Sequence, residues 1–195
     1  MIPNLIRLGI ETILKIKCET IIIKDIQILN KKDRFNGGID EISIKAENII
    51  FNKININNIY INIKDVNLKF AFFEKNFILD GGIATIVMRL TKENINKTFL
   101  NKNWNSLKTS IESFISMSFQ NIEIKNKSIY FLSSNTLSNT KLQYTLEYER
   151  NIISLVNNSN QAKLPILDDK NININNLILS ESYIEIELSS KLILN

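Results

Sequence analysis

Histidine is absent from this 195-residue chain, and cysteine occurs once. Without histidine there is no His-dependent catalytic triad, no imidazole metal site and no side chain whose unperturbed pKa lies near neutrality. The single Cys18 excludes an internal disulfide, and zinc sites built from His and Cys are excluded with it. We therefore predict no metal site, and most hydrolase mechanisms are ruled out.

Glycine and proline are also scarce, with five and two residues respectively. Four of the glycines form the pairs Gly37-Gly38 and Gly81-Gly82. Neither pair is followed by Lys-Ser/Thr or by a spaced third glycine, as a phosphate-binding loop requires. We interpret both pairs as turns and predict no cofactor.

Paired carboxylates are the remaining catalytic possibility. The nearest pairs are Asp168-Asp169, in a polar turn, and Glu185 with Glu187, on the outward phase of a predicted strand. Both are typical of solvated surface, so we predict that the protein is not an enzyme and has no catalytic residues. A glycosidase working with carboxylates alone is the third-ranked hypothesis.

The formal net charge is +4, with 24 Lys and Arg against 20 Asp and Glu. This excess permits attraction to anionic surfaces, but the basic residues are spread singly along the chain. The densest basic segment, 31–34, contains its own Asp33 in a predicted turn. Nucleic-acid binding needs a concentrated basic stripe, so we predict no nucleic-acid partner.

The composition, 44% hydrophobic and 23% charged, is typical of a globular protein, and we predict one domain over residues 1–195. Residues 2–18 are largely apolar, but Arg7, Glu11 and Lys15 interrupt them every four residues. That pattern lacks a signal-peptide core and a membrane span. We predict a cytoplasmic protein, with peripheral association at a membrane as a further option.

The longest pattern is an alternation of apolar and polar residues from Ile54 to Phe73. Twenty residues at about 3.3 Å each would extend about 65 Å, so the run predicts one unusually long, curved strand or a folded-back pair. Its phase slips at Asn57-Asn58 and again at Lys64-Asp65. A slip moves the apolar side chains to the other face, so we predict bulges or a tight hairpin there.

Other segments predict an α+β protein. Apolar residues at helical spacing predict a helix over 4–17, and its cations Arg7, Lys15 and Lys17 leave two options, packing on the sheet or lying at an anionic membrane interface; packing is the favoured one. Thr91 is the expected N-cap of a helix over 91–100, and a second helix continues to about Phe119. Period-two patterns predict strands over 19–29, 42–51 and 83–90 and a ladder of short strands after Asn121.

The order of elements and several hydrophobic patterns resemble the LmeA-like phospholipid-binding family, which is known from actinobacteria and cyanobacteria. The resemblance covers most of the chain and contains no catalytic motif. The most specific segment is 82–96, which resembles a family strand that ends at a helix start with Leu90-Thr91. The other segments are a glycine followed by an alternating strand, the strands after it and the closing alternation: 38–51, 54–68 and 170–188.

This resemblance implies a fold akin to tubular lipid-binding proteins, a long twisted antiparallel sheet curled around the N-terminal helix and a central helical pair. It implies a phospholipid or a membrane surface as partner, with acyl chains in an apolar groove between sheet and helices. Large apolar side chains of the sheet and the central helices are the expected lining: Phe70, Phe72, Ile111, Phe114 and Ile115. Arg89 and Lys92 are the expected headgroup contacts.

The alternative is a structural or protein-interaction β-rich domain whose core is filled and which has no ligand. Apolar side chains fill cores as readily as they line cavities. This alternative predicts association through sheet edges. The sequence leaves the oligomeric state and the identity of any lipid open.

Overall fold

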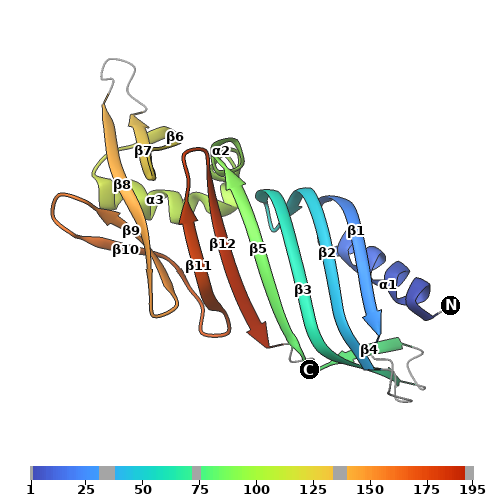
Figure 1. Ribbon diagram of the computed structural model, residues 1–195. Helices are drawn as coiled ribbons and strands as arrows, with labels where there is room; N and C mark the ends of the chain where they lie inside the picture. The colour runs from blue at the N-terminus through green and yellow to red at the C-terminus, as the bar shows by residue number, and fades with distance from the viewer. Residues whose placement is uncertain (1, 31–37, 72–75, 134–139, 192–195) are drawn as a thin grey trace.

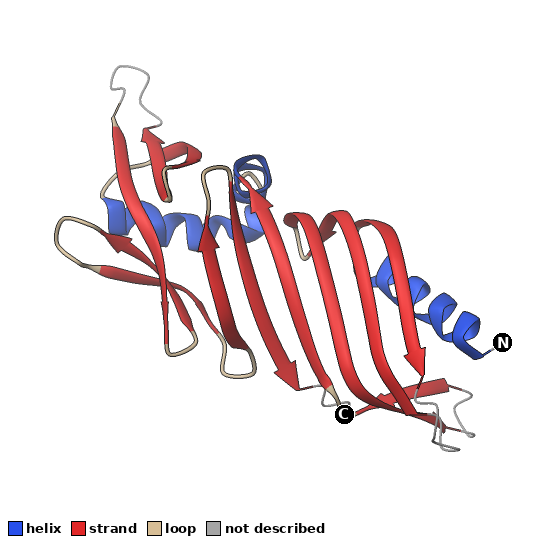
Figure 2. Cartoon of the chain, in the orientation of Figure 1, coloured by secondary structure: helices blue, strands red, loops and turns tan. Residues whose placement is uncertain are grey.

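The computed structural model describes residues 2–30, 38–71, 76–133 and 140–191. Within these ranges the chain forms two antiparallel sheets and three α-helices, which confirms the predicted α+β class (Figure 2). The helices are α1 (Ile2–Lys17), α2 (Lys92–Phe99) and α3 (Asn105–Ile115), with a 3₁₀ turn, η1 (Lys102–Trp104), between the last two. None of the described helices is both long and apolar enough to cross a bilayer.

Helix α2 begins where the sequence predicts. The Thr91 hydroxyl accepts a hydrogen bond from the Asn94 backbone N–H at 3.4 Å, and the Asn94 side-chain oxygen accepts one from the Thr91 N–H at 3.0 Å. This reciprocal pair satisfies two of the backbone donors that every helix start leaves free. Helix α3 ends earlier than predicted, because Ser116 adopts the left-handed conformation with φ 53° and stops the helical ladder.

The larger sheet has seven strands, and its central order is β1-β2-β3-β5-β12-β11, with β4 paired to β3 (Figure 1). Its strands are β1 (Thr20–Asn30), β2 (Gly38–Phe51), β3 (Ile54–Ala71), β4 (Asn76–Asp80), β5 (Ile83–Thr91), β11 (Asn173–Leu179) and β12 (Tyr183–Lys191). The smaller sheet has five strands in the order β10-β9-β8-β7-β6. They are β6 (Phe119–Lys125), β7 (Ser128–Ser133), β8 (Lys141–Glu149), β9 (Ile152–Asn157) and β10 (Lys163–Asp168).

Strand β3 runs without a hairpin for 18 residues, so the long-strand prediction is confirmed and the folded-back pair is wrong. It pairs with β2 from Ile54↔Phe51 to Asn67↔Gly38 with no shift in register. Asp65 absorbs the second phase slip by taking a left-handed conformation, with φ 56°. At the first slip it is Asn48 of the neighbouring strand that is left-handed, with φ 52°. No residue is inserted between β2 and β3 at either slip, whereas β2 shifts its register against β1 beside Asn48 and beside Asp40.

One face of the larger sheet is apolar and is covered at both ends. Helix α1 packs over β1 to β3 through Ile6, Ile10 and Leu14. At the other end the five-stranded sheet and α3 pack against β12, where Ile184 joins the core of the smaller sheet. The opposite face carries polar and charged side chains, as the alternation of a strand requires.

The predicted single sheet curled around the helices is not confirmed. Neither sheet is strongly curled, and β6 to β10 form a second sheet, while the last two strands, β11 and β12, return to the first. The strand pattern in the sequence does not make this division. Each of β6 to β10 is paired with the strand next to it in the chain, and none of them is paired with a strand of the larger sheet. The two sheets meet through side chains, which a strand pattern does not specify.

Candidate apolar binding cavity

A partly open cavity of about 210 Å³ lies where the two sheets meet α2, η1 and α3. Both sheets and all three of these elements contribute to its wall. Representative residues of each are Leu90 on β5, Ile184 on β12, Phe99 on α2, Ile111 on α3, Ile129 on β7 and Leu155 on β9. The cavity is therefore a property of the packed sheets and not of any single segment.

The wall is almost wholly apolar. Among its described residues only Thr98 and Trp104 carry a polar side-chain atom. The Thr98 hydroxyl is already used, since it donates to the Asn94 carbonyl at 2.8 Å and accepts from the Asn55 backbone N–H at 3.0 Å. The Trp104 indole N–H is buried without a partner. A guest would thus be held by dispersion and burial, and its polar part would remain outside the wall.

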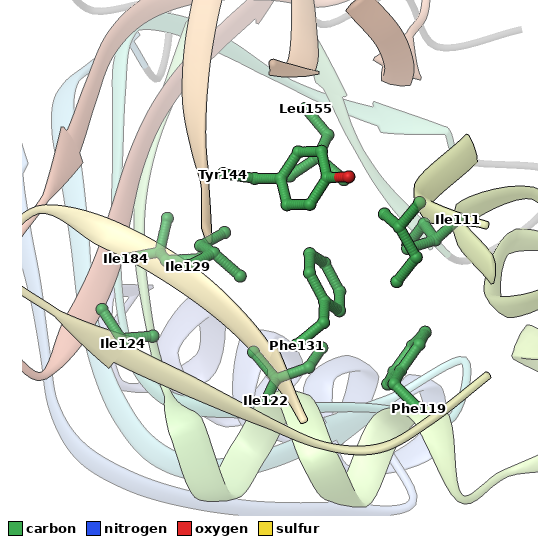
Figure 3. Packing of buried hydrophobic residues seen from close by; sticks show 10 residues of the cluster. Ile111, Phe119, Ile122, Ile124, Ile129, Phe131, Tyr144, Leu155 and Ile184 are labelled. Atoms are coloured by element: carbon green, nitrogen blue, oxygen red, sulfur yellow. The ribbon is translucent and has the colours of Figure 1, made fainter. Parts of the chain in front are cut away.

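An aromatic cluster stiffens the side of the cavity formed by the smaller sheet. Phe131 contacts Phe119 and Tyr144 edge to face, with ring centroids 5.0 and 5.7 Å apart. Figure 3 shows Ile111, Phe131 and Tyr144 converging from α3, β7 and β8. Such pairs contribute about 0.5–1.5 kcal/mol each beyond their buried area. Burial also raises the pKa of the Tyr144 phenol, because ionisation is unfavourable among these rings.

Helix α2 is fixed to both sheets by side-chain hydrogen bonds. Asn96 acts like an extra strand residue at the edge of β6: its amide donates to the Ile122 carbonyl at 3.0 Å and accepts from the Ile122 N–H at 2.8 Å. In the next residues of the helix, Thr98 accepts the N–H of Asn55 at the start of β3. These bonds satisfy backbone groups that the sheet pairing leaves free, and they fix α2 in the wall of the cavity.

A second tie joins the sheets beyond the cavity. Asn151, in the turn between β8 and β9, accepts the Ile174 backbone N–H at 3.2 Å. It also donates to the side chain of Asn173 at 3.2 Å. Next to it, Ile153, Ile174 and Leu188 form a buried cluster that spans both sheets. The cavity therefore lies between two regions of fixed contact.

The structure brings part of the predicted lining to this cavity. Ile111 lies in its wall and is 4% exposed. Ile115 is equally buried, and Phe114 is partly buried with its ring 5.8 Å from Tyr144. Both lie in the adjoining core and not in the wall. Phe72 lies outside the described residues, and so does the side chain of Phe70 on β3.

The predicted headgroup residues lie apart from the cavity wall. Arg89 forms an ion pair with Glu185 at 2.7 Å, and its guanidinium carbon is 4.2 Å from the centre of the Tyr183 ring. Alternation explains its position, because Leu90 lines the cavity and its neighbour points to the other face. There Arg89 lines a polar hollow of about 390 Å³. Lys92 is exposed at the start of α2, 3.6 Å from Glu93.

Several wall residues were missed by sequence reasoning. Phe131 and Leu155 belong to predicted strands, and Phe99 and Trp104 lie in or beside predicted helices. The sequence signals that mark the first two as core are the alternation of Ile129 with Phe131 and the apolar stretch 152–156. Nothing in the linear pattern places them opposite Ile184, because that contact is made between sheets.

The predicted surface carboxylates take ordinary structural roles. Glu185 pairs with Arg89, and Asp169 accepts the Asn171 backbone N–H at 2.8 Å in a turn. No group of three or more His, Cys, Asp or Glu side chains gathers as a metal site in the part of the chain that the structure describes.

Comparison of the chain with protein-family models, with curated proteins and with solved structures found no match. A function for this chain is therefore argued from the geometry of the cavity.

Proposed function

We propose that this protein binds a lipid, without enzymatic activity, by holding an acyl chain in the cavity between its two sheets. The observation that carries the proposal is an apolar, partly open cavity whose wall has no free hydrogen-bonding side chain other than a buried indole N–H. Such a site favours hydrocarbon over any polar ligand.

The volume limits the guest. An apolar cavity of about 150 Å³ binds benzene, which has six carbon atoms. By the same proportion, about 210 Å³ accommodates about eight carbon atoms. One acyl chain therefore enters over part of its length, and a second chain of the same lipid has to stay outside. Because the cavity is partly open, the rest of a longer chain can leave through the opening.

Phospholipid as the lipid class is supported by the sequence resemblance to the LmeA-like family, including segment 82–96. The family fold would hold the acyl chain between one curled sheet and its helices. In this protein the two sheets, α2 and α3 would together enclose the chain. The headgroup role of Arg89 and Lys92 gains no support from their position, since neither lines the cavity. The proposal therefore rests on the acyl chain.

The chain carries its own reporter for this proposal. Trp104 is the only tryptophan, and it lies in the cavity wall. Monoacyl lipids brominated on the chain should quench its fluorescence on contact, whereas the same lipids without bromine should not. We expect saturable quenching for octyl, dodecyl and hexadecyl chains. Absence of quenching at every length would refute the proposal.

A matched pair of variants assigns the quenching to the cavity. Leu107→Phe enlarges a side chain of the wall and should weaken binding by about fivefold or more, because overpacking costs about 1–3 kcal/mol. Leu142→Phe makes the same change in the adjoining core, outside the wall, and should leave binding unchanged. Equal effects of the two variants would show that the chain binds elsewhere.

The second candidate is the ligand-free interaction domain. The dense packing in and around the cavity wall favours it, since Phe119, Phe131 and Leu155 are each 2% exposed. Strand β1 is an edge of the larger sheet and carries the exposed side chains of Ile22 and Leu29. Under this hypothesis, brominated lipids leave Trp104 unquenched and the protein self-associates through β1 in analytical ultracentrifugation.

A further inference from the structure

Helix α1 has two apolar faces, and the fold uses only one of them. Ile6, Ile10 and Leu14 recur every four residues and pack against the larger sheet. A neighbouring face carries four large side chains that the described structure leaves uncovered. They are Leu5, Leu8, Ile13 and Ile16, exposed by 57%, 63%, 59% and 75%. Figure 1 shows α1 at one end of the molecule and the smaller sheet with α3 at the other.

The charges on α1 indicate what this face meets. Three cations, Arg7, Lys15 and Lys17, stand against one acid, Glu11, which is paired with Arg7 at 3.2 Å. Lys15 and Lys17 are exposed, with no ion pair to another described residue. In the last turn their positive charges interact favourably with the helix dipole. That interaction does not account for the exposed apolar side chains beside them.

We propose that α1 docks this protein on a bilayer that contains anionic lipids. The face of Leu5, Leu8, Ile13 and Ile16 would enter the boundary between headgroups and acyl chains, while Lys15 and Lys17 contact lipid phosphates. An anionic bilayer matches both features of the helix, because its apolar layer accepts the apolar face and its negative surface attracts the two lysines. Packing of Ile6, Ile10 and Leu14 on the sheet keeps α1 formed in the free protein, so docking requires no folding.

This inference rests on α1 alone and does not require the cavity to hold a lipid. Co-sedimentation with vesicles tests it. The purified chain should bind vesicles of phosphatidylcholine containing one third phosphatidylglycerol, bind phosphatidylcholine alone more weakly, and lose binding as salt rises. Leu8→Asp with Ile16→Asp, both at exposed sites, should abolish binding. Lys15→Glu with Lys17→Glu should weaken it at least tenfold, because each cation near such a surface contributes about fivefold.

Matched controls are available away from α1. Leu100→Asp replaces a leucine that is 80% exposed, and Lys125→Glu with Lys127→Glu reverses two exposed lysines at the end of β6 and in the turn after it. These controls should bind as the wild type does. If they lose binding as the α1 variants do, or if the α1 variants bind normally, the proposal is overturned. Dimerisation that Leu8→Asp with Ile16→Asp abolishes would overturn it too, because a second copy would then be the occupant of the face.

The two proposals can fail separately. The α1 variants should still show quenching of Trp104 by brominated lipids, and Leu107→Phe should still bind vesicles. Vesicle binding without quenching refutes the cavity proposal alone, whereas quenching without vesicle binding refutes docking through α1 alone.

Discussion

The turn before β5 offers a sharp test of the sheet that supports the cavity. Gly82 has φ +98°, and a Cβ there would lie 2.7 Å from the Lys64 carbonyl oxygen and 3.2 Å from Cγ2 of Val66. The first is a backbone atom in the middle of β3, and Lys64 is paired with both Glu41 and Ile83. It cannot move away without disturbing pairing on both sides.

Gly82→Ala should therefore destabilise the protein for two reasons. The left-handed backbone costs a residue with a Cβ about 1–2 kcal/mol, and forcing an atom into occupied space costs about 1–3 kcal/mol. Together we expect a loss of about 2–5 kcal/mol in the free energy of unfolding. Gly81→Ala is the matched control, because Gly81 has φ +74° but a Cβ added there would meet nothing within 4 Å. It should cost only the conformational part, about 1–2 kcal/mol.

Urea denaturation of both variants and the wild type measures the difference, provided that the dependence on urea concentration is unchanged. The gap between the two variants isolates the contact with β3 and should be about 1–3 kcal/mol. Equal stabilities for Gly82→Ala and Gly81→Ala would refute the close approach of this turn to the Lys64 carbonyl.

Three further predictions concern the cavity wall and its supports. Phe131→Ala should lower the free energy of unfolding by about 3–5 kcal/mol in urea, since it removes a buried ring from the aromatic cluster; a loss under about 1 kcal/mol would contradict that packing. Asn96→Ala removes both hydrogen bonds to Ile122 and should lower the free energy of unfolding by about 1–3 kcal/mol. Asn103→Ala, at an exposed position, should leave it nearly unchanged in the same assay. Equal losses for the two variants would contradict the attachment of α2 to β6. Burial raises the pKa of Tyr144, so the folded state holds the phenol proton more tightly than the unfolded state does. The stability that this difference contributes is complete at pH values below the pKa of the unfolded state. It is lost as the pH rises through the pKa of the folded state. Stability in urea should thus fall on the alkaline side for the wild type and fall less for Tyr144→Phe; parallel curves would contradict a buried phenol.

Local features of the structure follow closely from the sequence. The Thr91 cap needs only Asn94, three residues away, and the predicted helix start at Thr91 is confirmed. Helix α1 was predicted from the spacing of its apolar residues, but that spacing does not identify the face that packs. Ile6, Ile10 and Leu14 pack on the sheet, while Leu5 and Ile16 are exposed. Because α1 is apolar around much of its circumference, the neighbouring sheet decides which side is buried.

The candidate site was harder to predict. Ile111 was expected to line a groove and does lie in the cavity wall, whereas its neighbours Phe114 and Ile115 belong to the core beside it. Periodicity identifies residues that avoid water, but it does not distinguish a wall from a filled interior. That distinction depends on whether opposing side chains leave a gap between them.

By itself, the sequence determined that no histidine chemistry and no internal disulfide operate here, that the protein is α+β, and where α1, α2 and β3 lie. Only the tertiary structure decided that β6 to β10 form a separate sheet, that Phe131, Leu155 and Ile184 line one cavity, and that one side of α1 stays uncovered in the described structure. The physical reason is that backbone periodicity is a local property. The partner of an apolar face is chosen by packing between segments far apart in the chain.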